Sequence, residues 1–84
     1  MIKNFHINSY KYNDIVVKAT LYDNGIPIRW GVYKDDNVMS KYTGTFDYEI
    51  LPSSRTEDFF KEYRFFSAEE AIDCYYMFYK ITVV

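Results

Sequence analysis

The chain has little of what most reactive sites require. Its 84 residues include one cysteine, one histidine and three glycines. A single cysteine cannot form an internal disulfide, which favours a reducing compartment, so we expect the protein in the cytoplasm. One Cys and one His cannot supply the four protein ligands of a structural zinc site. Three scattered glycines also exclude a glycine-rich phosphate loop.

Long apolar runs are missing as well. No stretch approaches the about 18 apolar residues of a membrane span, and the first residues lack the apolar region of a signal peptide, so we expect no membrane association. A chain of 84 residues is expected to form a single domain over 1–84. The sheet is expected over about residues 3–50 and the helical part over about residues 55–80.

Candidate catalytic residues are few, and each has a simpler explanation. His6 lies in a weakly alternating segment with no Ser or Cys motif nearby, and Cys74 fits a small buried residue of a helix. The adjacent acidic pairs are typical of turns and of the first turns of helices: Asp35/Asp36, Glu57/Asp58 and Glu69/Glu70. We therefore expect no enzyme activity, no catalytic residue, no metal and no cofactor.

Aromatic residues are abundant in contrast. They make up 21% of the chain, with 10 Tyr, 7 Phe and 1 Trp. Aromatic side chains can build a small core from few residues, but this number exceeds what one small core can hide. We expect some of the tyrosines to be exposed, and exposed tyrosines are typical of interfaces.

An alternating pattern predicts a β-hairpin. Apolar and polar residues alternate over 14–22 and again over 26–34. Asn24 and Gly25 lie between them and favour a two-residue type I′ turn. The resulting register places the apolar residues on one face through these pairs: Leu21–Ile28, Ala19–Trp30 and Val17–Val32.

The segments on either side of the hairpin predict further strands. A three-residue turn over 35–37 predicts a third strand over about 38–50, with a bend at Gly44. Its predicted partners in the preceding strand form these pairs: Trp30–Tyr42, Ile28–Gly44 and Ile26–Phe46. Residues 5–8 alternate weakly and predict an N-terminal edge strand.

The remaining residues predict helices. A short helix near Thr56–Glu62, followed by extended Arg64–Phe66, is favoured, while a final strand over Lys61–Phe66 fits the pattern as well. A capping box at Ser67 predicts a helix from Ala68 to about Lys80. The predicted fold is α+β. It consists of an antiparallel meander of three to four strands and a C-terminal helix, with or without a second short helix, packed on one face.

The C-terminal helix carries the first candidate binding surface. Residues 47–84 contain four basic and eight acidic residues, against six basic and four acidic in 1–46. An acidic helix is suited to docking on a basic surface, including one that normally holds nucleic acid. The residues expected to bind a protein partner are Glu69, Glu70, Asp73, Tyr76 and Met77.

The outward face of the predicted sheet carries an alternative. Cations and aromatic rings on this face suit a single-stranded nucleic acid, and Met39 is expected to point outward there too. The residues expected to bind nucleic acid are Lys18, Arg29, Lys41, Tyr22 and Tyr33. A homodimer that pairs through an edge strand or through the Tyr76/Met77 stripe is the third alternative.

Two short stretches carry a resemblance to a known class of proteins: Leu21–Gly25 and Phe65–Glu70. They place an acidic-Asn-Gly turn after a strand and a Ser cap before a helix. In this layout, in size and in lacking catalytic motifs, the chain resembles small phage-encoded anti-CRISPR proteins of the type I-F inhibitors. The abundance of Ile, Lys, Asn, Tyr and Phe is also typical of AT-rich phage genes. The resemblance implies an anti-defence inhibitor from a phage or mobile element. Such an inhibitor blocks a host defence or nucleic-acid-handling complex in the host cytoplasm by occupying its surface.

Overall fold

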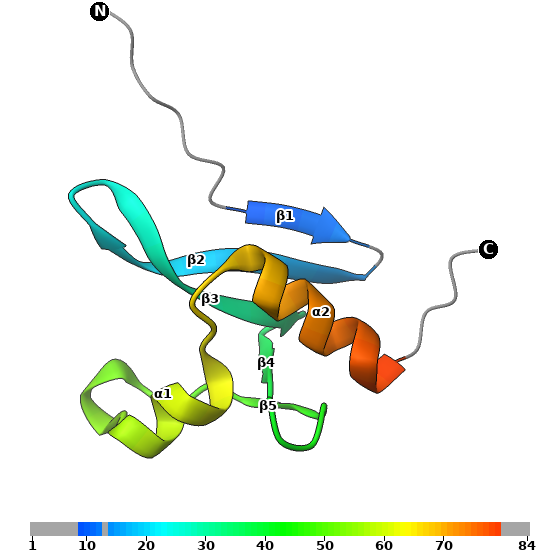
Figure 1. The fold of residues 1–84 in the computed structure, drawn as a ribbon. Coiled ribbons are helices and arrows are strands. Elements are labelled where there is room, and N and C mark those ends of the chain that lie inside the picture. The colour runs from blue at the N-terminus through cyan, green and yellow to red at the C-terminus, as the bar shows by residue number, and fades with distance from the viewer. Residues whose placement is uncertain (1–8, 13, 80–84) are drawn as a thin grey trace, which may run out of the picture.

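The computed structural model describes residues 9–12 and 14–79, which form a five-stranded antiparallel sheet and two α-helices. The strands pair in chain order as a meander: β1 Ser9–Tyr12, β2 Ile15–Asp23, β3 Ile26–Lys34, β4 Asn37–Met39 and β5 Phe46–Tyr48. The helical elements follow: a 3₁₀ turn, η1, at Pro52–Ser54, then α1 at Glu57–Tyr63 and α2 at Ala68–Tyr79 (Figure 1). The predicted α+β meander is confirmed, and it has one strand more than the upper expectation.

The β2–β3 hairpin has the predicted turn and most of the predicted register. Asn24 has a φ of 50° and Gly25 a φ of 80°, which are the positive values that a type I′ turn requires. Two of the three predicted apolar pairs are confirmed: Val17–Val32 and Ala19–Trp30.

The third predicted pair is wrong. Leu21 lies opposite Arg29 and not opposite Ile28, because the register shifts between Ala19 and Leu21. Thr20 is the extra residue of β2 at this point, which makes the irregularity a β-bulge.

The turn after β3 is shorter than predicted. Only Asp35 and Asp36 form it, with Asp35 at a φ of 55°, so that Lys34 lies opposite Asn37. A register change of one residue moves every following side chain to the other face of a sheet. Met39 therefore lies in the core and not on the outward face, where it was expected.

The predicted third strand over 38–50 is also wrong. The chain reverses direction over residues 40–45, and β5 returns to pair with β4. Gly44 allows this reversal with a φ of 74°. The pairs predicted for this strand do not form: Trp30–Tyr42, Ile28–Gly44 and Ile26–Phe46. Trp30 instead forms a bridge with Phe65, in which the two residues exchange backbone hydrogen bonds of 2.8 and 2.7 Å.

An N-terminal edge strand is present. β1 pairs antiparallel with β2, with Tyr10 opposite Val17 and Lys11 opposite Val16. The strand predicted at residues 5–8, which includes His6, lies outside the described residues.

Both helices begin at side-chain caps. The hydroxyl of Thr56 accepts a hydrogen bond of 3.4 Å from the backbone N–H of Phe59, and α1 follows. Since α1 runs to Tyr63, the predicted helix is confirmed and the alternative strand is wrong. The hydroxyl of Ser67 accepts a hydrogen bond of 3.1 Å from the backbone N–H of Glu70 and caps α2, as predicted. Neither helix, within the described part of the chain, has the length and apolar character needed to cross a bilayer.

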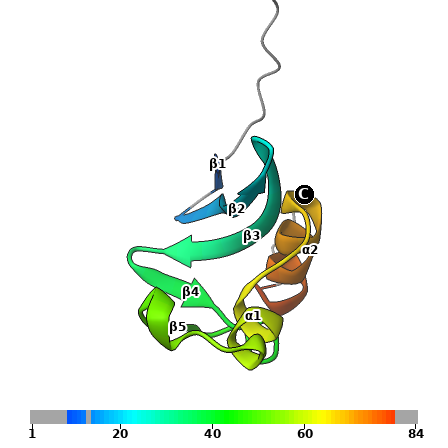
Figure 2. The same ribbon diagram turned by 90° about the vertical axis from the view of Figure 1, so that its left-hand side faces the viewer.

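The sheet is buried on both faces near β3. On one face α2 packs against β2 and β3 around the main core: Ile15, Val17, Trp30, Val32, Met39, Phe65, Ala71, Cys74 and Tyr75. On the opposite face Tyr33 and Val38 are buried. There the guanidinium of Arg64 lies 5.9 Å from the ring centre of Tyr33 and 5.0 Å from that of Phe59 in α1. Figure 2 shows α2 beside β2 and β3, with α1 at the β4–β5 end.

Candidate functional site

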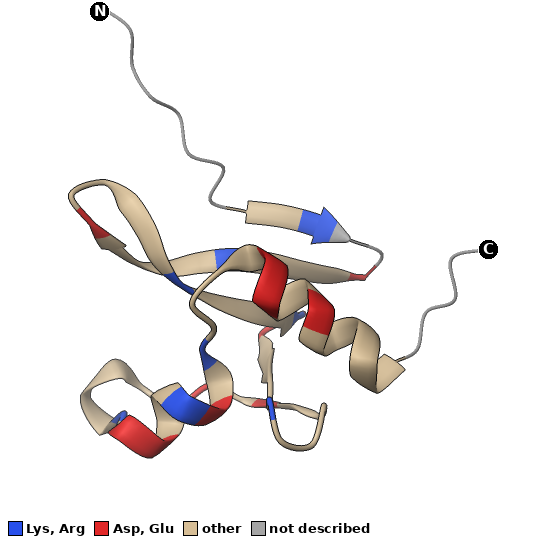
Figure 3. Cartoon of the chain, in the orientation of Figure 1, with Lys and Arg blue, Asp and Glu red and all other residues tan. Residues whose placement is uncertain are grey.

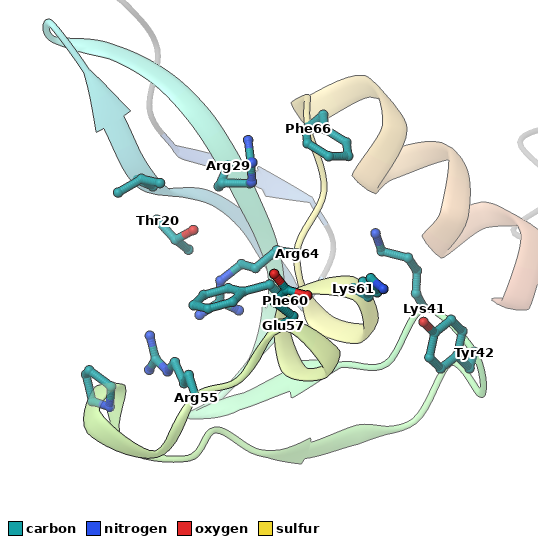
Figure 4. Close-up of a pocket in the computed structure, with 12 residues that line it drawn as sticks. Thr20, Arg29, Lys41, Tyr42, Arg55, Glu57, Phe60, Lys61, Arg64 and Phe66 are labelled. Atoms are coloured by element: carbon teal, nitrogen blue, oxygen red, sulfur yellow. The ribbon is translucent and has the colours of Figure 1, made fainter.

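An open groove lies between the β2–β3 hairpin, the turn over residues 40–45 and α1. Its volume is about 880 Å³. The charged residues that line it are five cations and one acid: Arg29, Lys41, Arg55, Lys61, Arg64 and Glu57. Large apolar side chains complete the lining: Leu21, Tyr42, Pro52, Phe60 and Phe66. We call this site the basic groove (Figure 4).

The β-bulge builds one wall of the basic groove. Residues that lie opposite each other in adjacent strands project from the same face of a sheet. Since Leu21 lies opposite Arg29, its side chain projects on the groove side, where it is 51% exposed. Thr20, the extra residue, lines the same wall. Bulges commonly redirect side chains beside binding sites, and this one brings an apolar side chain next to a cation.

The link between α1 and α2 builds the wall beside Arg29. The bridge between Phe65 and Trp30 holds this link against β3, and the next residue, Phe66, is 65% exposed. The guanidinium of Arg29 lies 4.4 Å from the ring centre of Phe66, and its Nη1 donates a hydrogen bond of 3.0 Å to the carbonyl of Ile28. These two contacts fix the arginine at the mouth of the groove.

Ser40 fixes the turn that carries Lys41 and Tyr42. The serine is fully buried, and its hydroxyl donates a hydrogen bond of 2.6 Å to the carboxylate of Glu62. The same hydroxyl accepts a hydrogen bond of 3.2 Å from the backbone N–H of Tyr42. The backbone N–H of Lys41 donates a hydrogen bond of 2.8 Å to the carbonyl of Glu62. Because Glu62 belongs to α1, these contacts join two walls of the groove.

One carboxylate neutralises two of the groove's arginines. Glu49 accepts hydrogen bonds of 2.6 Å from Arg64 and from the hydroxyl of Tyr33, and lies 3.4 Å from Arg55. Burial alone would raise the pKa of Glu49. The hydrogen bonds from Tyr33 and Arg64 and the positive charges of both arginines outweigh burial and hold this pKa below its usual value. Burial, together with the hydrogen bond to Glu49, raises the pKa of Tyr33.

The other three cations of the groove are not neutralised in this way. Arg29, Lys41 and Lys61 form no ion pair within residues 9–12 and 14–79. The ammonium of Lys41 lies 4.8 Å from the ring centre of Phe65, and Lys61 is exposed on α1. Figure 3 shows that acidic residues lie along α2, that cations lie on β1, β2 and β3, and that α1 carries both signs of charge.

Two of the five residues predicted to bind nucleic acid come together in the basic groove, Arg29 and Lys41. Lys18 lies 4.3 Å from the ring centre of Tyr33 instead, and Tyr22 is exposed on the hairpin. Tyr33 is buried, so its ring cannot serve as a stacking surface, and the structure corrects that part of the prediction.

Sequence reasoning missed most of the groove's apolar and α1 residues: Leu21, Tyr42, Phe60, Lys61 and Phe66. A signal existed for α1, since Glu57, Phe60 and Lys61 follow the i, i+3, i+4 spacing of one helical face. No local signal existed for Leu21 or Phe66, because the bulge and the bridge that place them depend on tertiary pairing.

The residues predicted to bind a protein partner lie on α2. Tyr76 is half-buried, and the other four are exposed: Glu69, Glu70, Asp73 and Met77. The three carboxylates form no ion pair with any other described residue. Lys41 lines both the basic groove and a shallow depression beside these acids, so the two surfaces meet at this lysine.

Cys74 is a buried free cysteine of α2 that packs in the main core, as expected of a small hydrophobic residue. Burial raises the pKa of its thiol, which keeps the thiol protonated and unreactive. Across residues 9–12 and 14–79, no group of His, Cys, Asp or Glu side chains is arranged to hold a metal ion.

The basic groove and the acidic face of α2 are therefore the two exposed surfaces at which the candidate binding residues gather. Comparison of the chain with protein families, with curated proteins and with solved structures finds no match.

Proposed function

We propose that this is a non-enzymatic binding protein that holds an anionic partner in the basic groove. The observation that carries the proposal is the position of Arg29, Lys41 and Lys61, which lack ion-pair partners among the described residues and lie around an open groove. Exposed aromatic rings lie beside these cations and offer apolar surface that a partner can bury.

The distribution of charge supports an anionic partner that binds in one orientation. The chain has a net charge of −2, yet its groove is lined by five cations and one acid. Acidic residues gather instead along α2 (Figure 3). A molecule polarised in this way attracts an anion to the groove and repels it from α2, which speeds and orients the encounter.

In the cell, we propose the role of a phage or mobile-element inhibitor. It would block a host defence or nucleic-acid-handling complex by occupying its surface. The resemblance of Leu21–Gly25 and Phe65–Glu70 to segments of anti-CRISPR proteins supports this role, and such an inhibitor needs no reactive groups. The acidic face of α2 offers a second contact, to a basic surface of the same complex.

Capture from a lysate of the native host tests the proposal. A tagged Arg29→Gln/Lys61→Gln variant is compared with wild type and with Lys11→Gln/Lys34→Gln, which makes the same change in charge outside the groove. We expect the wild type and the control to capture the same partner, and the groove variant to capture at least tenfold less of it.

Two outcomes would overturn the proposed function. If the groove variant keeps the partner while Glu69→Gln/Asp73→Asn loses it, the working surface is α2 and not the groove. If sedimentation at several concentrations shows a dimer and Met77→Ser dissociates it, the homodimer alternative replaces the inhibitor. Turnover of a substrate by the purified chain would contradict the non-enzymatic part.

A further inference from the structure

We propose that the anionic partner in the basic groove is a segment of single-stranded nucleic acid, with bases against the aromatic rings and phosphates at the cations. This inference rests on the proposed function and names the partner's chemistry. It places nucleic-acid binding in the groove, at the hairpin end of the outward sheet face, and not at Tyr33, which is buried.

The aromatic rings of the groove come from three separate segments. Tyr42 lies in the turn after β4, Phe60 on α1, and Phe66 in the link before α2. All three are exposed, with Phe66 65% exposed although it follows the fully buried Phe65. Aromatic side chains placed along a groove serve as stacking surfaces for successive bases, whatever the base, because every base has a flat face.

The three free cations are placed to contact phosphates. Arg29 uses Nη1 to donate to the carbonyl of Ile28, and its guanidinium has further N–H groups that can donate to a phosphate. The contact with the Phe66 ring holds it in place, so less conformational freedom is lost on binding. Lys41 and Lys61 lie on the other two walls, so a backbone crossing the groove passes cations from three elements.

A polar atom in the groove wall also lacks a partner. Oγ1 of Thr20 is buried and forms no hydrogen bond with any other described residue. Buried hydroxyl groups are rarely left in this state. Thr20 lies in the bulge beside Leu21 and Arg29 and lines the groove. A sugar or base edge offers the donor or acceptor that this hydroxyl lacks.

These features fit a nucleic-acid strand better than an acidic peptide or a free nucleotide. A peptide in a groove needs partners for its backbone N–H and C=O groups, whereas this lining consists mainly of rings, aliphatic groups and cations. A free nucleotide carries one base, whereas three exposed rings on three segments can each take a base.

Fluorescence anisotropy of a labelled six-nucleotide thymidylate strand tests the inference on the whole chain. If the three cations each neutralise a phosphate, the logarithm of the binding constant falls with the logarithm of salt concentration with a slope of about −2. Binding then weakens about 20-fold from about 50 mM to about 200 mM salt. Lys61→Gln should reduce the slope by about 0.7, and Lys11→Gln should leave it unchanged.

A second pair of variants tests stacking apart from charge. Tyr42→Leu keeps the side chain apolar but removes an exposed ring of the groove, and should weaken binding at least about fivefold at every salt concentration, with the slope unchanged. Tyr48→Leu removes an exposed ring outside the groove and should have no effect. Circular dichroism and urea unfolding of each variant verify that the fold is kept.

Three results would overturn the inference. One is no binding of the strand at low salt, and another is equal weakening by Tyr42→Leu and Tyr48→Leu. The third is displacement by ADP at the same concentration as unlabelled strand, which would make the ligand a free nucleotide. If an Asp/Glu-rich peptide containing Phe binds instead, and Arg29→Gln/Lys61→Gln weakens it, the proposed function stands without nucleic acid. If no groove variant alters any capture, the proposed function fails as well.

Discussion

Leu21 lies opposite Arg29 across the β2–β3 hairpin, one residue away from the partner that the Asn24-Gly25 turn would give it. In the uninterrupted register, Leu21 would share the face of Ala19 and the main core. The bulge at Thr20 moves it to the other face, beside a cation. The bulge therefore forms one wall of the groove.

The hydroxyl in this bulge leads to the first prediction. Thr20→Val should raise the free energy of unfolding by about 1 kcal/mol, because it removes a buried hydroxyl that has no partner and keeps the side-chain shape. Thr45→Val is the matched control. The Thr45 hydroxyl lies 2.7 Å from that of Thr43 and is exposed, so this change should be neutral or slightly destabilising. Urea unfolding measures both, and a loss of stability in Thr20→Val would show that its hydroxyl is satisfied.

The hairpin was predictable because its determinants are local. Positive φ values at Asn24 and Gly25 and the alternation over 14–34 depend on neighbouring residues alone. The caps at Thr56 and Ser67 are local for the same reason, so both helices could be found from the sequence.

The segment after β3 was not predictable in this way. Apolar alternation continues past Met39, but buried Ser40 bonds to Glu62 in α1 and turns the chain back. The place beside Trp30 is then taken by Phe65, which is distant in sequence. Since the groove is built from these long-range contacts, the sequence predicted only Arg29 and Lys41 of its five cations and did not predict its shape.

The second prediction concerns Glu49, which binds Arg64, Arg55 and Tyr33 together. Glu49→Gln should lower the free energy of unfolding by about 2–3 kcal/mol, because it leaves the charge of Arg64, which is only 3% exposed, without a counter-ion. For a chain of this size the melting temperature should fall by about 10–20 °C. Asp36→Asn, at an exposed turn, should change stability by less than about 0.5 kcal/mol. A Glu49→Gln variant as stable as wild type would contradict the structural role of this network.

The same carboxylate predicts a dependence of stability on acid. The pKa of Glu49 is lowered in the folded protein, so the unfolded chain takes up its proton first as the pH falls below about 4.3. The contribution of Glu49 to stability is therefore present above that pH and is lost as the pH falls through its folded pKa. Urea unfolding from about pH 6 to about pH 3 should show a shallower loss in Glu49→Gln than in wild type.

Asp14→Asn is the control for this series. The pKa of Asp14 is also lowered, by its hydrogen bond with Lys34, but the pair is exposed, and exposed pairs contribute little. An identical acid profile in wild type and Glu49→Gln would refute the assignment to Glu49.

Tyr63 predicts that stability falls as the pH rises in the alkaline range, whereas Glu49 predicts that stability falls as the pH drops. Burial, followed by its hydrogen bond of 2.9 Å to Asp47, raises the pKa of this tyrosine to about 12. An unfolded tyrosine loses its proton near about pH 10, so above that pH the folded state binds more protons than the unfolded state. Stability should therefore fall as the pH rises from about 10 toward 12. Tyr63→Phe should reduce this fall, and an unchanged alkaline profile would argue against a raised pKa.

Two glycines with similar backbone angles should respond differently to substitution. Gly25 has a φ of 80° and open space around its Cα, so Gly25→Ala should cost about 1 kcal/mol from backbone strain alone. Gly44 has a φ of 74°, and a Cβ there would lie 2.5 Å from Cγ and 2.9 Å from Cβ of Phe78. Since Cβ is fixed to the backbone of α2, rotation of Phe78 cannot relieve the whole clash, and Gly44→Ala should cost about 2–4 kcal/mol.

A double-mutant cycle separates strain from clash at Gly44. If the clash dominates, Gly44→Ala should cost about 1 kcal/mol in a Phe78→Ala background, as Gly25→Ala does in wild type, because only backbone strain remains. The difference in the cost of Gly44→Ala between the two backgrounds measures how strongly α2 packs against the turn over 40–45. The Tyr79 hydroxyl also donates a hydrogen bond of 2.5 Å to the carbonyl of Gly44 in this turn. Equal costs of Gly44→Ala in both backgrounds, measured by urea unfolding, would mean that Phe78 does not pack on this turn in solution.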